Sequence, residues 1–156
     1  MSIRIGIIGT GGIADNAHAP AVNEVKGAAL TAVLSRNEQN ARSFLDRHNA
    51  QNATAHTSLE SFTADSNIDL VIVTSPDRLH AQHALACLNA GKHVLLEKPF
   101  ATSVAEAESL AKAAKANGLI LWVGFHLRSH NGHRALLDSI VNQQSIGKLR
   151  HIRAIW

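Results

Sequence analysis

Short apolar runs alternate with amphipathic stretches along most of this chain. Each run holds several β-branched or leucine residues and ends close to a glycine, a proline or a serine. Runs of this length without polar alternation are typical of strands that are buried on both faces of a parallel sheet. We predict five strands, at residues 3–9, 29–35, 69–76, 93–99 and 119–125, and a weaker one at residues 53–57.

The segments between these runs have the spacing of amphipathic helices. Gly91 and Gly118 stand where a helix would end in a left-handed turn. Ser103 is followed three residues later by Glu106, the pattern of a capping box at a helix start. Helices are predicted at residues 37–50, 79–91 and 103–118.

The repeated order of strand, helix and strand determines the expected architecture. Strands joined through helices by short connections pair in parallel, with helices on both faces of the sheet. We predict an α/β fold with a doubly wound parallel sheet of the Rossmann type over residues 1–125. Residues 126–156 are expected to form a crossover helix followed by a strand.

Composition narrows the class of protein. The chain has 156 residues, 46% of them hydrophobic and 17% charged, which suits one globular domain. The formal net charge of +3 does not call for nucleic acid as a partner. The single cysteine, Cys87, lies in a helical pattern and is expected to be a buried thiol. The N-terminal apolar run is too short for a signal peptide or a membrane span, so we expect a soluble cytoplasmic protein without a membrane partner.

A glycine-rich turn follows the first predicted strand. Its sequence, GTGGIA, is a G-x-G-x-x-A pattern formed by Gly9, Gly11, Gly12 and Ala14. Such a turn lets the backbone approach a pyrophosphate, which then lies at the positive end of the next helix. The alternative is a turn that merely packs tightly. The expected cofactor-binding residues here are Gly9, Thr10, Gly11, Gly12 and Ile13.

The end of the second predicted strand indicates which dinucleotide binds. NAD sites usually place an acid there to accept a hydrogen bond from the ribose 2′-hydroxyl. This chain has Ser35 and Arg36 instead, and a hydroxyl and a guanidinium suit a 2′-phosphate. We therefore expect NADP, with NAD as the alternative. Arg36 could equally be a solvated loop charge or could stack on adenine without any preference between the cofactors.

Charged residues end the strand predicted at residues 93–99. Glu97 and Lys98 precede Pro99 at the carboxyl edge of the sheet, where ligands of open parallel sheets bind. A lysine there could act as the general acid or base that moves a hydroxyl proton during hydride transfer. Glu97 could orient the lysine, and Pro99 could fix the direction of the chain. The competing interpretation is a surface ion pair at a strand end.

Several motifs in this order resemble the N-terminal half of the Gfo/Idh/MocA family of NAD(P)-dependent oxidoreductases. They are GIIGTGGIA, the segment from TSPDRLH to AGKHVLLEKP, WVGFHLR, and IGKLRHIRAIW. The resemblance implies hydride transfer to or from a sugar, a polyol or a related hydroxy or keto compound, with Lys98 in proton transfer. It also implies that Pro76 and its neighbours line the cofactor and that Arg128 faces the active-site cleft. The expected cofactor-binding residues in these motifs are Ser75, Pro76, His80, Glu97 and Arg128. By itself, His80 would more often be a helix-start residue.

The resemblance covers one half of a two-domain enzyme. Members of the family carry a second α/β domain, which supplies the substrate pocket and commonly the dimer interface. We therefore expect a fragment, a truncated gene product, or a chain whose other half is supplied separately. The alternative to an active oxidoreductase is a dinucleotide-binding module that has no turnover of its own, since a lysine without a pocket cannot position substrate.

The last thirty residues are basic and rich in histidine. In LRHIRAIW the apolar residues alternate with basic ones, and an unpaired strand of this kind favours a homo-oligomer, most simply a dimer through this tail. Phosphate contacts to nucleic acid are a weaker alternative, because aromatic residues are scarce. A metal site at His126, His130 and His133 lacks a cysteine or a well-placed carboxylate, so no metal is predicted.

Overall fold

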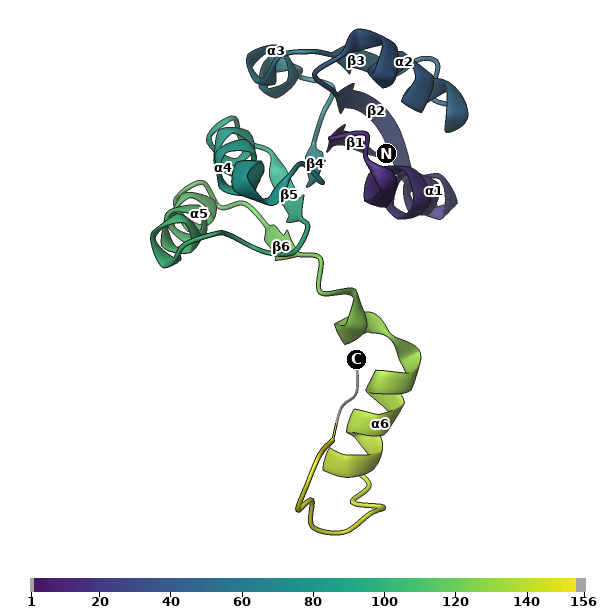
Figure 1. Ribbon diagram of the computed structural model, residues 1–156, viewed down its shortest axis with the longest axis vertical. Helices are drawn as coiled ribbons and strands as arrows, with labels where there is room; N and C mark the ends of the chain where they lie inside the picture. The colour runs from purple at the N-terminus through teal and green to yellow at the C-terminus, as the bar shows by residue number, and fades with distance from the viewer. Residues whose placement is uncertain (1, 154–156) are drawn as a thin grey trace. The chain divides into compact units, whose positions relative to one another are not determined.

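The computed structural model describes residues 2–153, and the part up to Gly124 is a parallel sheet flanked by helices (Figure 1). Across the sheet the strands run in the order β3-β2-β1-β4-β5-β6, so the chain crosses back over β1 to reach β4. This confirms the doubly wound α/β fold and all six predicted strands. The strands are β1 (Ile3–Ile8), β2 (Ala28–Leu34), β3 (Thr54–His56), β4 (Leu70–Val73), β5 (His93–Leu96) and β6 (Leu121–Val123).

Two hydrophobic clusters, one on each face of the sheet, hold the helices. One cluster contains Phe62, Leu88 and Leu110, contributed by α3, α4 and α5. The other contains Val22 and Phe44, from α1 and α2. The helices of this part are α1 (Ala19–Glu24), α2 (Glu38–Arg47), α3 (Leu59–Ala64), α4 (His80–Asn89) and α5 (Val104–Ala116).

The central strand β1 divides its side chains between these clusters. Ile5 and Ile7 belong to the cluster under α1 and α2, whereas Ile8 belongs to the cluster under α3, α4 and α5. Gly6 faces the same way as Ile8, and a Cβ atom on Gly6 would lie 2.6 Å from Cζ of Phe62. The Phe62 ring, which is fully buried, therefore occupies the space that a side chain at position 6 would need.

Serine hydroxyls cap the start of two of these helices, α3 and α5. Helix α3, which the sequence pattern did not predict, starts where the Ser58 hydroxyl accepts the backbone N–H of Ser61. At α5 the Ser103 hydroxyl accepts the N–H of Glu106, as the capping box requires. The Glu106 carboxylate, however, accepts from the backbone and hydroxyl of Thr102 rather than from Ser103. The predicted box is therefore completed one residue earlier.

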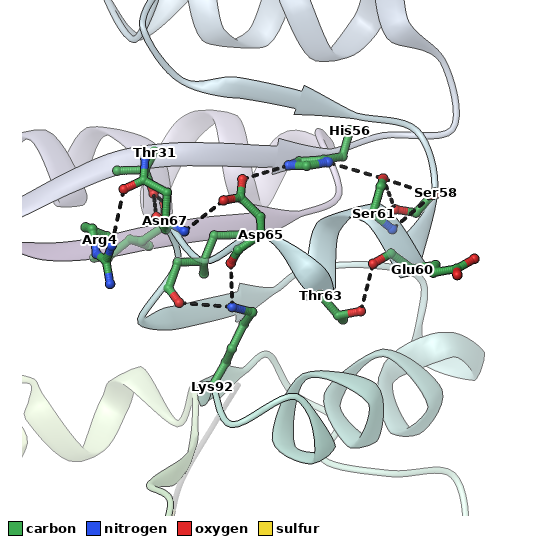
Figure 2. Close-up of polar contacts among 12 residues, drawn as sticks. Arg4, Thr31, His56, Ser58, Glu60, Ser61, Thr63, Asp65, Asn67 and Lys92 are labelled. Carbon is green, nitrogen blue, oxygen red and sulfur yellow. Dashed lines mark hydrogen bonds and ion pairs between the residues drawn. The ribbon is translucent and has the colours of Figure 1, made fainter.

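Polar side chains fasten the segment between α3 and β4 to its neighbours (Figure 2). Lys92 is 5% exposed, and its ammonium group donates to the carbonyl oxygens of Asp65 and Ile68 at 2.7 and 3.1 Å. The His56 ring pairs through Nε2 with the Asp65 carboxylate at 3.0 Å. Elsewhere in the core, burial raises the pKa of the Cys87 thiol to about 12, so the predicted inert thiol agrees with the structure.

An ion pair at the start of β1 gives this fold a dependence on acid. Arg4 donates its side chain and its backbone N–H to the Asp69 carboxylate, and these bonds lower the pKa of Asp69 from 3.8 to about 2. A carboxylate whose pKa is lower in the folded chain than in the unfolded chain stabilises the fold at every pH above the unfolded-state pKa. This stabilisation is lost as the pH falls towards the folded-state pKa of about 2. Both side chains are more than a third exposed, so we expect a modest effect.

We expect Asp69→Asn to lower the melting temperature at neutral pH and to lose this penalty in acid. Thermal unfolding of the wild type and the variant, followed by circular dichroism from about pH 7 to about pH 2, measures the difference. The gap between the two melting temperatures should narrow as the pH falls below 3.8. Glu60→Gln, on the exposed side of α3, is the matched control and should show no such narrowing. A gap that stays constant down to about pH 2 would contradict the role of the ion pair.

The residues from Phe125 onward form a second unit. It contains a short 3₁₀ helix, η3 (His126–Ser129), and a longer helix, α6 (Asn131–Val141), whose crossover role stays a prediction. Residues 149–153 form no strand, and Ala154, Ile155 and Trp156 lie outside the described residues, so the expected strand and its self-association stay predictions.

Within residues 2–153, no helix is long and apolar enough to cross a membrane.

Candidate functional site

A cavity of about 800 Å³ opens beyond the carboxyl ends of β1, β2 and β4. This is the edge at which open parallel sheets bind ligands, at the point where the strand order reverses. Three loops, one after each of these strands, supply most of its wall. The lining residues are Ile8, Gly9, Thr10, Gly11, Gly12, Ile13, Leu34, Ser35, Arg36, Asn37, Asn40, Thr57, Leu59, Thr74, Ser75, Pro76, Arg78, Leu79 and His83.

The glycine turn after β1 forms the floor of this cavity. Gly9 has φ of +100°, and a Cβ atom there would lie 3.0 Å from the carbonyl oxygen of Thr74, so both the turn and the packing require glycine. A Cβ atom on Gly11 would meet no other atom within 4 Å. The missing side chain at Gly11 therefore leaves space on the cavity side rather than relieving a clash inside the protein. All five predicted residues of this turn line the cavity.

The helix after the turn has an unusual start. Its backbone is helical over residues 12–24, and the segment η1 (Ala14–His18) is a π-helix that precedes α1. The backbone N–H of Asp15 donates to the carbonyl oxygen of Gly11 at 3.0 Å. Ala14 is fully buried, which agrees with the small residue expected at this position. The N-terminal end of the helix therefore begins at the cavity wall, where its free N–H groups favour an anion.

The loop after β2 brings hydroxyl, guanidinium and amide groups to the cavity. Ser35 and Arg36 line the cavity, and the Ser35 hydroxyl lies 3.4 Å from the hydroxyl of Thr10. Asn37 caps α2 by accepting the N–H of Asn40. Within residues 2–153 the Arg36 side chain makes no hydrogen bond or ion pair. No acidic side chain is among the lining residues, so an additional phosphate would meet no negative charge in this wall.

Two histidines of α4 hold the turn after β4 through hydrogen bonds to Ser75. Ser75 and Pro76 line the cavity, as predicted. The Ser75 hydroxyl bonds to Nδ1 of His83 at 2.9 Å, and the carbonyl oxygen of Ser75 accepts from Nε2 of His80 at 2.7 Å. Burial, and then the neighbouring His80 ring, lower the pKa of His83 below its ordinary value, so His83 presents a neutral ring to the cavity at neutral pH.

His80 begins α4 next to the cavity, but its ring faces the protein interior. It is 1% exposed and is absent from the cavity lining, because both ring nitrogens are used inside the protein. Nδ1 bonds to the carbonyl oxygen of Pro99 at 2.7 Å, and Nε2 bonds to Ser75. Its cofactor contact therefore stays a prediction, and in this structure His80 supports the turn that lines the cavity.

Glu97 and Lys98 follow β5 and also lie outside the cavity lining. The Glu97 carboxylate is largely buried and bonds through Oε1 to Nε2 of His18 at 2.9 Å. Its Oε2 accepts the backbone N–H of Lys98 at 3.0 Å. Glu97 therefore orients the backbone of Lys98, whereas no ion pair forms between the two side chains in the described part of the chain. The Lys98 side chain is exposed, and the Lys98–Pro99 peptide bond is cis.

Sequence reasoning missed several residues of this site. Asn37, Asn40, Arg78 and His83 line the cavity, and His18 reaches Glu97 across 79 positions of the chain. His83 stands one helical turn after His80, and this spacing was the only local signal for it. Arg128 belongs to the second unit, in η3, so its predicted place at the cleft stays a prediction. Among residues 2–153, no group of three or more His, Cys, Asp or Glu side chains could hold a metal ion.

Comparison with known proteins identifies the family. Residues 3–125 match the family described as "Oxidoreductase family, NAD-binding Rossmann fold". The chain belongs to the Gfo/Idh/MocA family. It is 43% identical over 119 residues to the scyllo-inositol 2-dehydrogenase (NADP(+)) IolU of Bacillus subtilis, with 76% of this chain and 35% of that enzyme covered.

Other Gfo/Idh/MocA relatives act on sugar derivatives. The chain is 34% identical over 152 residues to a dTDP-3,4-didehydro-2,6-dideoxy-alpha-D-glucose 3-reductase of Actinomadura kijaniata, covering 97% of this chain and 45% of that enzyme. The crystal structure of the 3-ketoreductase KijD10 of the same organism, in complex with TDP-benzene and NADP, matches with a TM-score of 0.84 at 33% identity. The match covers 90% of this chain and 43% of KijD10. This chain therefore spans less than half the length of these relatives.

Proposed function

We propose that this chain is the cofactor-binding part of an NADP-preferring oxidoreductase that acts on a sugar, a polyol or a related hydroxy or keto compound. The observation that carries the proposal is the cavity beyond β1, β2 and β4, whose floor is open at Gly11 and whose wall contains Ser35 and Arg36. The names of the relatives support the same cofactor and substrate class.

The residues of the cavity have separate tasks in this proposal. The turn from Gly9 to Ile13 would hold the pyrophosphate against the start of the following helix. Ser35 and Arg36 would hold the 2′-phosphate through charge-assisted hydrogen bonds. The turn of Ser75 and Pro76 would close the wall after β4. When bound, NADP supplies the ring that accepts or donates the hydride.

Lys98 is the residue that we assign to proton transfer. An exposed amine after β5 stands at the carboxyl edge of the sheet, free to meet a substrate hydroxyl that approaches from outside. As general base it would remove the hydroxyl proton during oxidation, and as general acid it would return that proton during reduction. A dinucleotide-binding module without turnover is the second candidate, because the cavity accounts for cofactor binding and Lys98 lies outside its lining.

Cofactor titration tests the proposal directly. Quenching or enhancement of NADPH and NADH fluorescence should show saturable binding, with NADPH bound about tenfold tighter or more. Arg36→Ser should weaken NADPH about tenfold or more and change NADH less than about threefold. Lys112→Ser, an exposed lysine on α5, removes the same charge and should change neither affinity. If neither NADPH nor NADH binds at about 1 mM, the proposal is rejected.

Lys98→Ala separates the enzyme from the binding module. Where the wild-type chain shows turnover of NADP with a panel of sugars and polyols, the variant should lose it and keep its NADPH affinity. Lys112→Ala is the control for the loss of one lysine. Unchanged turnover in Lys98→Ala would remove Lys98 from the mechanism, and a wild-type chain that binds NADPH without any turnover would support the binding module.

A further inference from the structure

The two residues that flank Lys98 are each bonded to a histidine, and the two histidines come from different helical segments. Before Lys98, the Glu97 carboxylate pairs with His18, which ends the π-helical segment after the glycine turn. After Lys98, the Pro99 carbonyl oxygen accepts from His80, whose other ring nitrogen bonds to Ser75 in the β4 turn. Lys98 therefore lies between two attachments, one to the glycine-turn helix and one to the β4 turn.

The bond between His18 and Glu97 is largely shielded from solvent. The His18 and Glu97 side chains are 16% and 13% exposed, so their 2.9 Å bond is little screened by water. The second carboxylate oxygen of Glu97 accepts the Lys98 N–H, and this leaves the carboxylate bonded at both ends. A Cβ atom on Gly124 would lie 3.0 Å from Oε1 of Glu97, so glycine at 124 makes room for the carboxylate.

The attachment through His80 is buried and uses the whole ring. Both partners of the ring, the carbonyl oxygens of Ser75 and Pro99, can only accept hydrogen bonds. Glutamine can replace the Nε2 donor but not the Nδ1 donor. His80→Gln therefore keeps the bond to Ser75 and removes the bond to Pro99.

We propose that His18 and His80 are positioning residues that fix the backbone on both sides of Lys98 to the two cavity loops. The loops that would hold the cofactor and the lysine that would move the proton are thereby kept in one arrangement. Remote groups matter in such a site because a small displacement of a reacting group costs much of its catalytic effect. The inference rests on the proposed function, which gives Lys98 its task.

Amide hydrogen exchange at Lys98, measured by NMR without cofactor, tests the inference. The Lys98 N–H donates to Glu97, so its exchange reports whether the carboxylate is held in place. The Thr74 N–H, which donates to Ile8, is the internal reference for a general loss of stability. Relative to Thr74, exchange at Lys98 should be about tenfold faster or more in His18→Leu and in His80→Gln.

Two control variants separate positioning from general stability. His18→Gln restores an Nε2 donor at a similar reach, so Lys98 should exchange at the wild-type rate within about threefold. His56→Leu removes a pair of similar burial and distance, His56 with Asp65, which joins the end of β3 to the residue after α3 (Figure 2). It should lower the melting temperature without changing exchange at Lys98 relative to Thr74. If His18→Leu does not fold, His18→Asn, whose amide is too short to reach Glu97, replaces it.

Equal relative exchange at Lys98 in the wild type, His18→Leu and His80→Gln would overturn the inference. NADPH titration of the same samples keeps this result separate from the proposed function. If no sample binds NADPH, the proposed function fails, whereas the exchange rates measured without cofactor still decide whether the two histidines hold the lysine.

Discussion

Replacing Gly11 with valine is expected to lower NADPH affinity about 100-fold or more and to leave the fold intact. A Cβ atom at this position meets no protein atom within 4 Å, and φ is outside the left-handed region, so the folded chain tolerates a side chain. The same open space lies at the floor of the cavity, where the backbone would contact the pyrophosphate. The branched side chain would hold the phosphates away from the N–H groups, and several charge-assisted bonds would be lost together.

Fluorescence titration with NADPH and thermal unfolding, measured on the same preparations, test this expectation. Gly11→Ala should weaken binding less than Gly11→Val, because the smaller side chain fills less of the space. Both variants should melt within a few degrees of the wild type. Wild-type NADPH affinity in a folded Gly11→Val chain would show that the cofactor does not lie on this turn.

The second large effect concerns the contact of Gly6 with Phe62. A Cβ atom at position 6 would lie 2.6 Å from Cζ of Phe62 and 3.1 Å from Cδ1 of Ile68. The ring is fully buried and cannot move away without displacing its neighbours, so Gly6→Ala should destabilise the chain by about 1–3 kcal/mol. Phe62→Ala, which empties the same space, should cost about 3–5 kcal/mol.

A double-mutant cycle in urea isolates this contact. Leucine at position 62 has no atom where Cζ stands, so Gly6→Ala should cost at least about 1 kcal/mol less in the Phe62→Leu background than in the wild type, although the contact with Ile68 stays. Phe44 is also fully buried but belongs to the cluster on the other face of the sheet. Gly6→Ala should therefore keep its full cost in the Phe44→Leu background. Equal costs in the Phe62→Leu and Phe44→Leu backgrounds would contradict the proposed clash.

The site was predictable to the extent that its chemistry is local in sequence. Gly9 requires a positive φ immediately after a buried strand, and Ser35 with Arg36 stands directly at a strand end. His80 illustrates the limit. Its place next to the β4 turn was expected, but its orientation was not, because the acceptor on Pro99 lies 19 positions away. The direction of a side chain depends on such partners, and no local pattern encodes them.

The sequence by itself determined the order of strands and helices, the doubly wound sheet and the position of the glycine turn. These follow from hydrophobic periodicity and from the backbone angles that particular residues permit, and both act within a few residues. Only the tertiary structure decided that α3 forms, that its Phe62 ring fills the space next to Gly6, and that His18 bonds to Glu97. These contacts join residues far apart in the chain, and they form only after the sheet has brought their elements together.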